Sequence, residues 1–167
     1  NYLFPQTLEE DIVIETLKYA GINQVFDFKV KDLRKYIGIL FYMSYYKIPN
    51  SRDYWSSNDN RCVNVIKNQR TMKRFEKIRE LLHFNDKDKM PDRNDPDRDR
   101  LYLIRPVIDS LNITFFSVPK LQKLSVDEQM CSTKIGSYMK QYLPNKPKKL
   151  SFKLFVMCDT MGYAYNF

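Results

Sequence analysis

The amino-acid sequence predicts an α+β protein, with helices in the N-terminal part and the first strands of an antiparallel sheet at the C-terminal end. Apolar residues recur with helical spacing up to about residue 119. From about residue 124 apolar and polar residues alternate instead, which is typical of strands. No internal repeat or low-complexity tract interrupts this layout. We therefore expect a helical region over residues 1–119 and a strand region over residues 120–167.

The first helix is predicted over residues 8–20. Thr7 and Glu10 have the spacing of a capping box, in which a hydroxyl and a carboxylate satisfy backbone groups at the start of a helix. Gly21 is placed to end the helix in the left-handed conformation, which glycine adopts without steric cost.

A second helix is predicted over residues 32–46, where apolar residues occur on almost every side. This pattern favours a central buried helix, ended by Pro49. Another helical segment is expected from Ser51. It contains Tyr54 and the single tryptophan, Trp55, which we interpret as a packing anchor.

Residues 70–82 form the clearest amphipathic segment. One side is apolar, and another has a basic stripe, with Glu76 and Glu80 as the acidic residues available to offset it. The stripe consists of Arg70, Lys73, Arg74 and Lys77. A solvated helix face and a contact with DNA phosphates both explain it, and both alternatives remain open. His83 follows, without a metal-ligand partner nearby, so we expect a packed histidine.

Residues 85–100 are nearly all charged and include two prolines, which predicts a loop. Its aspartates could chelate a cation, but the interleaved Lys and Arg compete for them, and we expect no metal there. A further helix is predicted from Leu101, with Pro106 in its first turn and Pro119 after its end. Beyond it, strands are predicted over 124–130, 150–158 and 163–167, the last two forming a hairpin.

Composition indicates a polyanionic partner. The 28 Lys and Arg outnumber the 20 Asp and Glu, for a net charge of +8, and nucleic acid suits such a field better than a membrane surface. No apolar run approaches the roughly 18 residues of a membrane span, and no signal peptide is evident, so we expect a soluble intracellular protein without a membrane partner. The three cysteines are widely spaced, which favours reduced thiols.

A cluster of cations lies between the first two predicted strands. Its members are Lys134, Lys140, Lys146, Lys148 and Lys149, with Tyr138 and Tyr142 interleaved. Lysines neutralise phosphates and tyrosines stack on bases or bond to phosphate, so a nucleic-acid contact is favoured over a flexible solvated loop.

Asp127 lies within the first predicted strand, shortly before this lysine cluster. A strand-borne carboxylate beside cations suits metal-assisted chemistry on phosphodiesters. Taken alone, one acidic residue in a strand more often has no catalytic role.

Short motifs spread over nearly the whole chain resemble, in the same order, those of the piggyBac-type transposases and the host proteins derived from them. They are Arg52–Trp55, Arg74–Glu76, Leu82–Asp86, Leu101–Tyr102, Ile104–Pro106 with Asp109, Val126–Met130, Tyr142–Pro147, and Asp159 with Gly162–Tyr163.

The resemblance implies a helical dimerisation and DNA-binding region followed by an RNase H-like domain, with Asp127 as its first catalytic aspartate. It implies Mg²⁺ as cofactor, double-stranded DNA (transposon ends or derived genomic sites) as partner, a homodimer, and a nuclear location. The other catalytic aspartates of that family lie beyond Gly162–Tyr163, so we expect no cleavage from this segment alone. Glu128 is a poor substitute, because neighbouring strand residues face opposite ways.

Two positions depart from the family pattern. Residues 134–137 lack the Gly-Arg pair that relatives commonly have, and Leu150–Ser151 replaces their frequent Trp-Gly. These departures lean towards the alternative function, a domesticated nuclear protein that binds DNA or other proteins without cutting. An active transposase region remains the other hypothesis, and a structural fragment explains the resemblance poorly.

Overall fold

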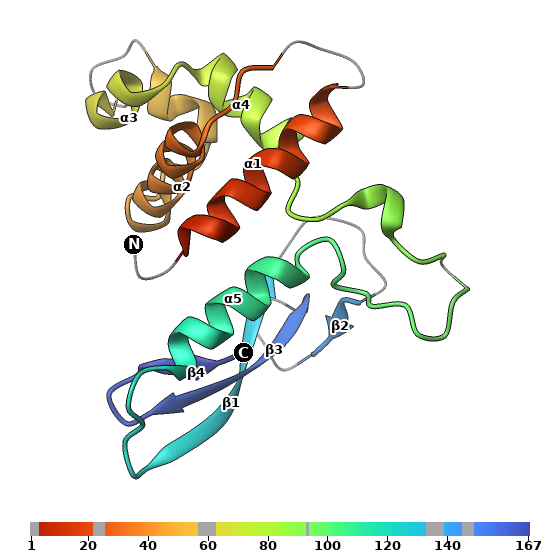
Figure 1. The fold of residues 1–167 in the computed structure, drawn as a ribbon. Coiled ribbons are helices and arrows are strands. Elements are labelled where there is room, and N and C mark those ends of the chain that lie inside the picture. Colours follow the sequence, from red (N-terminus) through yellow and green to blue (C-terminus); the bar gives the residue numbers. More distant parts are fainter. Residues whose placement is uncertain (1–3, 22–25, 57–62, 93, 133–138, 145–148) are drawn as a thin grey trace. The chain divides into compact units, whose positions relative to one another are not determined.

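A computed structural model describes residues 4–21, 26–56, 63–92, 94–132, 139–144 and 149–167 (Figure 1). The chain divides into two compact units, one ending at Val107 and one beginning at Ile108, and each is described by itself. We call them the helical unit and the sheet unit. The predicted boundary after residue 119 divides the chain by function and not by packing, and it stays a prediction.

The helical unit contains four α-helices and two short 3₁₀ helices in its described residues. They are α1 (Gln6–Gly21), α2 (Val30–Tyr45), η1 (Ser51–Trp55), α3 (Asn64–Gln69), α4 (Met72–Leu81) and η2 (Lys87–Lys89). No described helix has both the length and the apolar content to cross a membrane.

The two ends of α1 differ from the prediction. The helix begins at Gln6, and the Pro5 carbonyl accepts the Glu9 N–H at 3.2 Å. Thr7 therefore lies inside the first turn, and the predicted capping box is wrong. Gly21 is the last helical residue, while Gly162 is the glycine with positive φ among the described residues. The predicted left-handed end at Gly21 is wrong as well.

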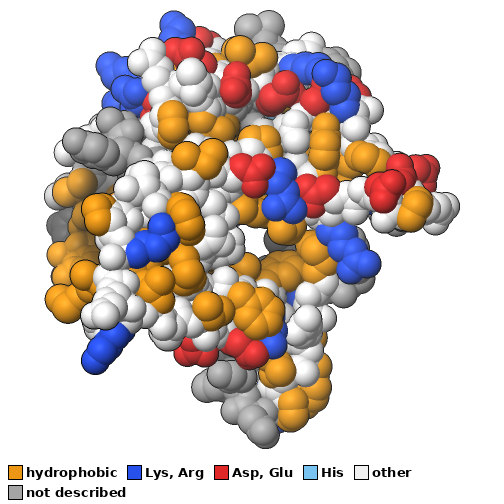
Figure 2. Space-filling view, turned by 60° about the horizontal axis from the view of Figure 1, so that its bottom comes forward, with side chains coloured by type: hydrophobic (Ala, Val, Ile, Leu, Met, Phe, Trp, Pro, Cys, Tyr) orange, Lys and Arg blue, Asp and Glu red, His pale blue; other side chains and the backbone are white. Residues whose placement is uncertain are grey.

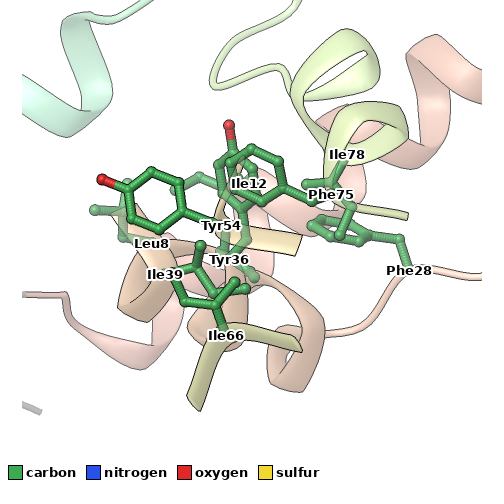
Figure 3. Packing of buried hydrophobic residues seen from close by; sticks show 10 residues of the cluster. Leu8, Ile12, Phe28, Tyr36, Ile39, Tyr54, Ile66, Phe75 and Ile78 are labelled. Carbon is green, nitrogen blue, oxygen red and sulfur yellow. The ribbon is translucent and has the colours of Figure 1, made fainter. Parts of the chain in front are cut away.

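The core of the helical unit gathers one side of each helix (Figure 3). It consists of Leu8, Ile12, Phe28, Leu33, Tyr36, Ile39, Tyr54, Ile66, Phe75 and Ile78. The prediction that the second helix is buried on every side is wrong, because α2 buries Leu33, Tyr36 and Ile39 but leaves Phe41 56% and Tyr45 80% exposed.

Two aromatic predictions are confirmed. The Trp55 ring lies 5.1 Å from that of Phe75, and its indole N–H donates to the Arg70 carbonyl at 2.7 Å, as expected of a packing anchor. His83 stacks on Tyr19 with ring centroids 3.6 Å apart, which makes it a packed histidine.

Aspartates shape the charged segment that follows. Asp92, Asp95 and Asp99 each accept a backbone N–H from the residue two positions later, at 2.9–3.1 Å. Such local bonds make turns. Turns continue to residue 104, so α5 (Arg105–Phe116) begins later than Leu101, with Pro106 in its first turn as predicted.

The sheet unit contains β1 (Leu124–Ser132), β2 (Gln141–Tyr142), β3 (Leu150–Asp159) and β4 (Ala164–Asn166). All pairs are antiparallel: β1 follows one edge of β3, while β2 and β4 pair with opposite ends of β3. The α+β class and the β3–β4 hairpin are confirmed. The two-residue strand β2 was not predicted, because two residues are too few to show alternation.

Candidate functional site

Asp127 lies in the middle of β1, where it is paired with Val156 of β3. Its side chain is exposed, and one carboxylate oxygen accepts the N–H of the next residue, Glu128, at 2.7 Å. Strand alternation places Ser125 and Gln129 on the same face as Asp127. The carboxylate is therefore held on a regular strand and accessible to a ligand.

Glu128 is directed to the other face and is already paired. Its carboxylate lies 2.5 Å from the ammonium of Lys153, which is also 4.7 Å from the centre of the Phe155 ring. Phe155 is the cross-strand partner of Glu128, which shows that these three side chains share a face. This arrangement supports the expectation that Glu128 does not substitute for a second metal ligand beside Asp127.

The described residues do not supply a full set of metal ligands around Asp127. No group of three or more His, Cys, Asp or Glu that could hold a metal ion occurs there. A carboxylate oxygen is the ligand type that Mg²⁺ prefers, so the chemistry of Asp127 fits that ion. The remaining ligands would have to come from residues other than the described ones.

The described members of the lysine cluster flank β2. Tyr142 lies in β2 and is 63% exposed, Lys149 is exposed just before β3, and Lys140 is half-buried just before β2. Lys134, Lys146 and Lys148 lie outside the described residues, as does Tyr138. The exposed ring and ammonium are accessible to a polyanion, as the prediction requires.

The register of the sheet separates Asp127 from these side chains. Ser151 pairs with both Ser132 and Gln141, so β2 lies beside the end of the ladder. Ser132 is five residues beyond Asp127 in β1, or about 17 Å at the rise of a strand. Of the lysine cluster, the described Lys140 and Lys149 therefore lie near one end of the ladder, and Asp127 lies near its middle.

The basic stripe predicted over residues 70–82 is used within the helical unit, with Arg70 just before α4 and the other three cations in it. Arg70 forms an ion pair with Asp32, and the Arg74 guanidinium lies 3.8 Å from the same carboxylate and 4.5 Å from the centre of the Phe26 ring. The statement that Glu76 and Glu80 alone offset the stripe is wrong, because tertiary packing brings Asp32 of α2 to it.

The other two cations of the stripe differ. Lys77 pairs with Glu80 at 3.3 Å, whereas Lys73 is exposed and makes no ion pair with a described residue. DNA contact by Arg70, Lys73, Arg74 and Lys77 stays a prediction. In Figure 2 the blue Lys and Arg side chains lie in several separate groups, some of them beside red acidic ones.

Asp159 and Tyr165 form a buried polar cluster that the sequence did not reveal. The Asp159 carboxylate accepts the Tyr165 hydroxyl at 2.8 Å and the N–H groups of Met161 and Tyr163 at 2.8 and 3.0 Å. The Tyr165 hydroxyl and these N–H groups lower the pKa of Asp159. Burial, and then the bond to Asp159, raise the pKa of Tyr165. Asp159 ends β3, and its carboxylate accepts N–H groups of the turn that follows. Its bond to the Tyr165 hydroxyl, which we call the polar clasp, could not be predicted from the sequence.

Another charged group lines a hollow in the helical unit. Lys18 forms an ion pair with Asp86, and this bond lowers the pKa of the Asp86 carboxyl. The stacked rings of Tyr19 and His83 line the same hollow. Glu15, Lys87 and Asp88 also line it, so charges of both signs surround the hollow.

Comparison with known proteins identifies the family. The family model described as Transposase IS4, a DDE transposase family, matches residues 1–167. The human protein named PiggyBac transposable element-derived protein 2 is 28% identical over 158 residues, which cover 93% of this chain and 26% of that protein.

A solved structure has the same fold. The cryo-EM structure of a piggyBac transposase synaptic complex with hairpin DNA superposes with a TM-score of 0.84, at 21% identity, over 99% of this chain and 36% of that chain. This chain thus spans between a quarter and about a third of the length of these proteins. The predicted resemblance is confirmed, and the chain belongs to the Transposase IS4 family.

Proposed function

We propose that this chain is the DNA-binding and first catalytic portion of a piggyBac-type transposase, which cleaves DNA and transfers strands in the nucleus. The observation that supports this most is the position of Asp127. In a chain matched throughout by a DDE transposase family, this carboxylate is exposed in the middle of a regular strand. The sheet unit would be the opening of an RNase H-like domain.

In this proposal Asp127 is a ligand for a divalent ion, Mg²⁺ in the first instance. Such an ion would stabilise the charge that develops on the oxygens of a phosphodiester during displacement. The contribution of this chain is to hold one carboxylate oxygen in place: the β1–β3 ladder fixes the Asp127 backbone, and the N–H of Glu128 orients one oxygen.

The proposed partner is double-stranded DNA, from transposon ends or genomic sites derived from them. The net charge of +8 and the exposed Lys149 and Tyr142 support it. The structural relative was solved with hairpin DNA, which is a statement about that protein. We further propose that the protein acts as a homodimer.

The test of the catalytic proposal is Mg²⁺-dependent strand cleavage by the full-length protein, comparing wild type with Asp127→Asn. We expect the substitution to abolish cleavage while DNA binding persists, because a carboxamide oxygen is neutral and holds a divalent ion weakly. Glu128→Gln is the matched control, since it removes a neighbouring carboxylate on the other face. Full cleavage by Asp127→Asn would overturn the catalytic proposal.

The DNA-binding proposal is tested by the double substitution Lys146→Ala with Lys148→Ala. We expect weaker binding to all sequences and a smaller dependence of affinity on salt, because phosphate contacts release counterions. Lys87→Ala with Lys89→Ala removes the same charge from the helical unit and serves as control. An unchanged salt dependence would remove the lysine cluster from the DNA interface.

The alternative is a domesticated protein that binds DNA or other proteins without cutting it. One observation favours this alternative: the human relative is named as derived from a transposable element. The same cleavage assay distinguishes the two functions, because a domesticated protein would retain salt-dependent DNA binding and show no Mg²⁺-dependent cleavage even as wild type.

A further inference from the structure

We propose that the outward face of α2 pairs with the same face of a second copy of the chain. The outward face is the row Arg34, Gly38, Phe41 and Tyr45, which lies opposite the core-facing side of the helix. This inference names a surface for the homodimer proposed above, and it rests on that proposal.

The first argument is a mismatch between the composition of α2 and its burial. Residues 36–46 contain no charged residue, and a helix that is apolar on every side is normally buried on every side. In the structure the core covers only one side, and on the outward side Phe41 and Tyr45, one turn apart, are 56% and 80% exposed. Large aromatic side chains that are exposed next to each other are typical of an interaction site.

The second argument is that the aromatic side chains of this region are already ordered. Tyr46 stacks on Tyr42 with ring centroids 4.8 Å apart, and it meets Tyr45 edge to face at 4.9 Å. The Tyr54 hydroxyl donates to the Tyr46 carbonyl, which ties the end of α2 to η1. Large rings that are held in place cost little conformational entropy when a partner binds.

The third argument concerns charge and selects a second copy as the partner. Two copies of this chain, each with a net charge of +8, repel each other over most of their surfaces. The uncharged stretch 36–46 lets two copies meet without placing like charges together. Arg34, at the end of the row, is neutralised by Glu9, which accepts its Nε–H at 2.9 Å.

The fourth argument is the shape of the row. Gly38 lies in the interior of α2, where glycine costs about 1 kcal/mol relative to alanine. A Cβ added at Gly38 would meet nothing within 4 Å, so packing inside the chain does not require a glycine there. Gly38 is therefore a shallow notch beside the large ring of Phe41.

An antiparallel pairing about a two-fold axis between Gly38 and Phe41 makes this shape self-complementary. Gly38 of each copy then faces Phe41 of the second copy, which fills the notch. Arg34 and Tyr45 are spaced equally about the same axis, so the guanidinium of one copy faces the tyrosine ring of the other, a favourable cation–π arrangement. A symmetric interface requires such reciprocal contacts.

The test is the oligomeric state of the full-length protein, measured by sedimentation over a concentration series. We expect Gly38→Leu and Tyr45→Lys each to weaken the dimer at least about tenfold, because one fills the notch and the other places two charges at the interface. Gly38→Leu should leave the thermal stability of the monomer unchanged or higher, since leucine is the better helix former. Ile113→Lys, at a 73% exposed apolar position of α5, is the matched control and should leave the dimer intact.

The outcomes separate the surface from the proposals on which it rests. A wild-type protein that stays monomeric at about 100 µM would contradict both the homodimer and this surface. A dimer that survives Gly38→Leu and Tyr45→Lys would contradict the surface alone. A loss of DNA affinity in Tyr45→Lys without a change in oligomeric state would show that α2 meets DNA instead, and would equally overturn the inference.

Discussion

The helical unit and the sheet unit use their apolar residues in opposite ways. In the helical unit a closed cluster around Ile12, Leu33 and Ile78 is almost inaccessible to solvent. In the sheet unit Tyr165 is the one buried hydrophobic residue among those described, while Val126 and Phe155 are 67% and 57% exposed. Hydrophobic burial among the described residues is therefore concentrated in the helical unit.

The difference explains where the candidate chemistry lies. A residue that meets a metal ion and DNA must be accessible, and Asp127 is exposed in β1. The acidic residues of the helical unit are used differently: Glu9 and Asp32 neutralise arginines between helices. The comparison predicts that core substitutions lower the stability of the helical unit most. It also predicts that acid weakens the sheet unit through the bond between Asp159 and Tyr165.

The largest effect is expected from Ile78→Ala in the helical core. Ile78 is fully buried, and such truncations cost about 2–5 kcal/mol. Thermal unfolding followed by the fluorescence of Trp55, which lies on Phe75 of the same core, measures it. Ile113→Ala, at an exposed site, should change stability by less than about 0.5 kcal/mol. If β1 and β3 lose hydrogen-exchange protection together with the Trp55 signal, the two units do not behave separately.

A smaller effect is expected from Asp32→Asn. The carboxylate pairs with Arg70 and Arg74 and also accepts the N–H of Lys29 at 3.1 Å at the start of α2. Removing its charge leaves two partly buried guanidinium groups without their anion, at a cost of about 1–3 kcal/mol in unfolding free energy. Urea denaturation measures this cost. Asp11→Asn, at an exposed site of α1, is the control for loss of one acidic charge, and an equal effect there would contradict a specific role for Asp32.

Tyr165→Phe tests the polar clasp of the sheet unit and should lower its melting temperature by a few degrees. The lost hydroxyl bond should also raise the pKa of Asp159 towards its ordinary value of 3.8. Since the folded-state pKa is depressed, the stabilisation is present above the unfolded-state pKa and is lost as pH falls through the folded one. The variant should thus lose hydrogen-exchange protection in β3 and β4 at a higher pH than wild type. Tyr163→Phe is the control. If Tyr165→Phe and wild type lost protection at the same pH, the role of the clasp would be contradicted.

The smallest effect is expected at Asp99, in the charged segment before α5. The Arg105 guanidinium donates to both carboxylate oxygens, at 2.7 and 2.8 Å, and holds the pKa of Asp99 at about 2. In Arg105→Gln this pKa should rise towards 3.8, with little change in stability near neutral pH because the pair is partly exposed. NMR titration of the carboxyl carbon measures the shift. A pKa that stays near 2 would show that Arg105 is not its cause.

Local features of the fold could be predicted because they depend on neighbouring residues. The amphipathic period of residues 70–82 predicted α4, Pro106 marked a first helical turn, and the alternation after residue 124 predicted β1. The ends of the helices and strands were predicted less accurately. Pro5 displaced the start of α1 from Thr7, and β2 was too short to show a period.

The candidate site could be predicted only in part. The short motifs in family order over nearly the whole chain were sufficient to find the family, and Asp127 lies in the strand that was predicted. The pairing of Arg70 and Arg74 with Asp32 was missed, because charge counting along α4 does not include a carboxylate on α2. Of the proposed lysine contacts, Lys140 and Lys149 are placed at the β2 end of the sheet, and their role stays a prediction.

The sequence by itself determined the class of the longer segments, the family, and the strand position of Asp127, since periodicity, turn residues and motifs act over short distances along the chain. The tertiary structure alone decided which side of α2 is buried, which arginines are neutralised, and that Tyr165 closes on Asp159. These features join residues that lie on separate elements or across a turn. Their distances depend on how helices and strands pack, which no local pattern specifies.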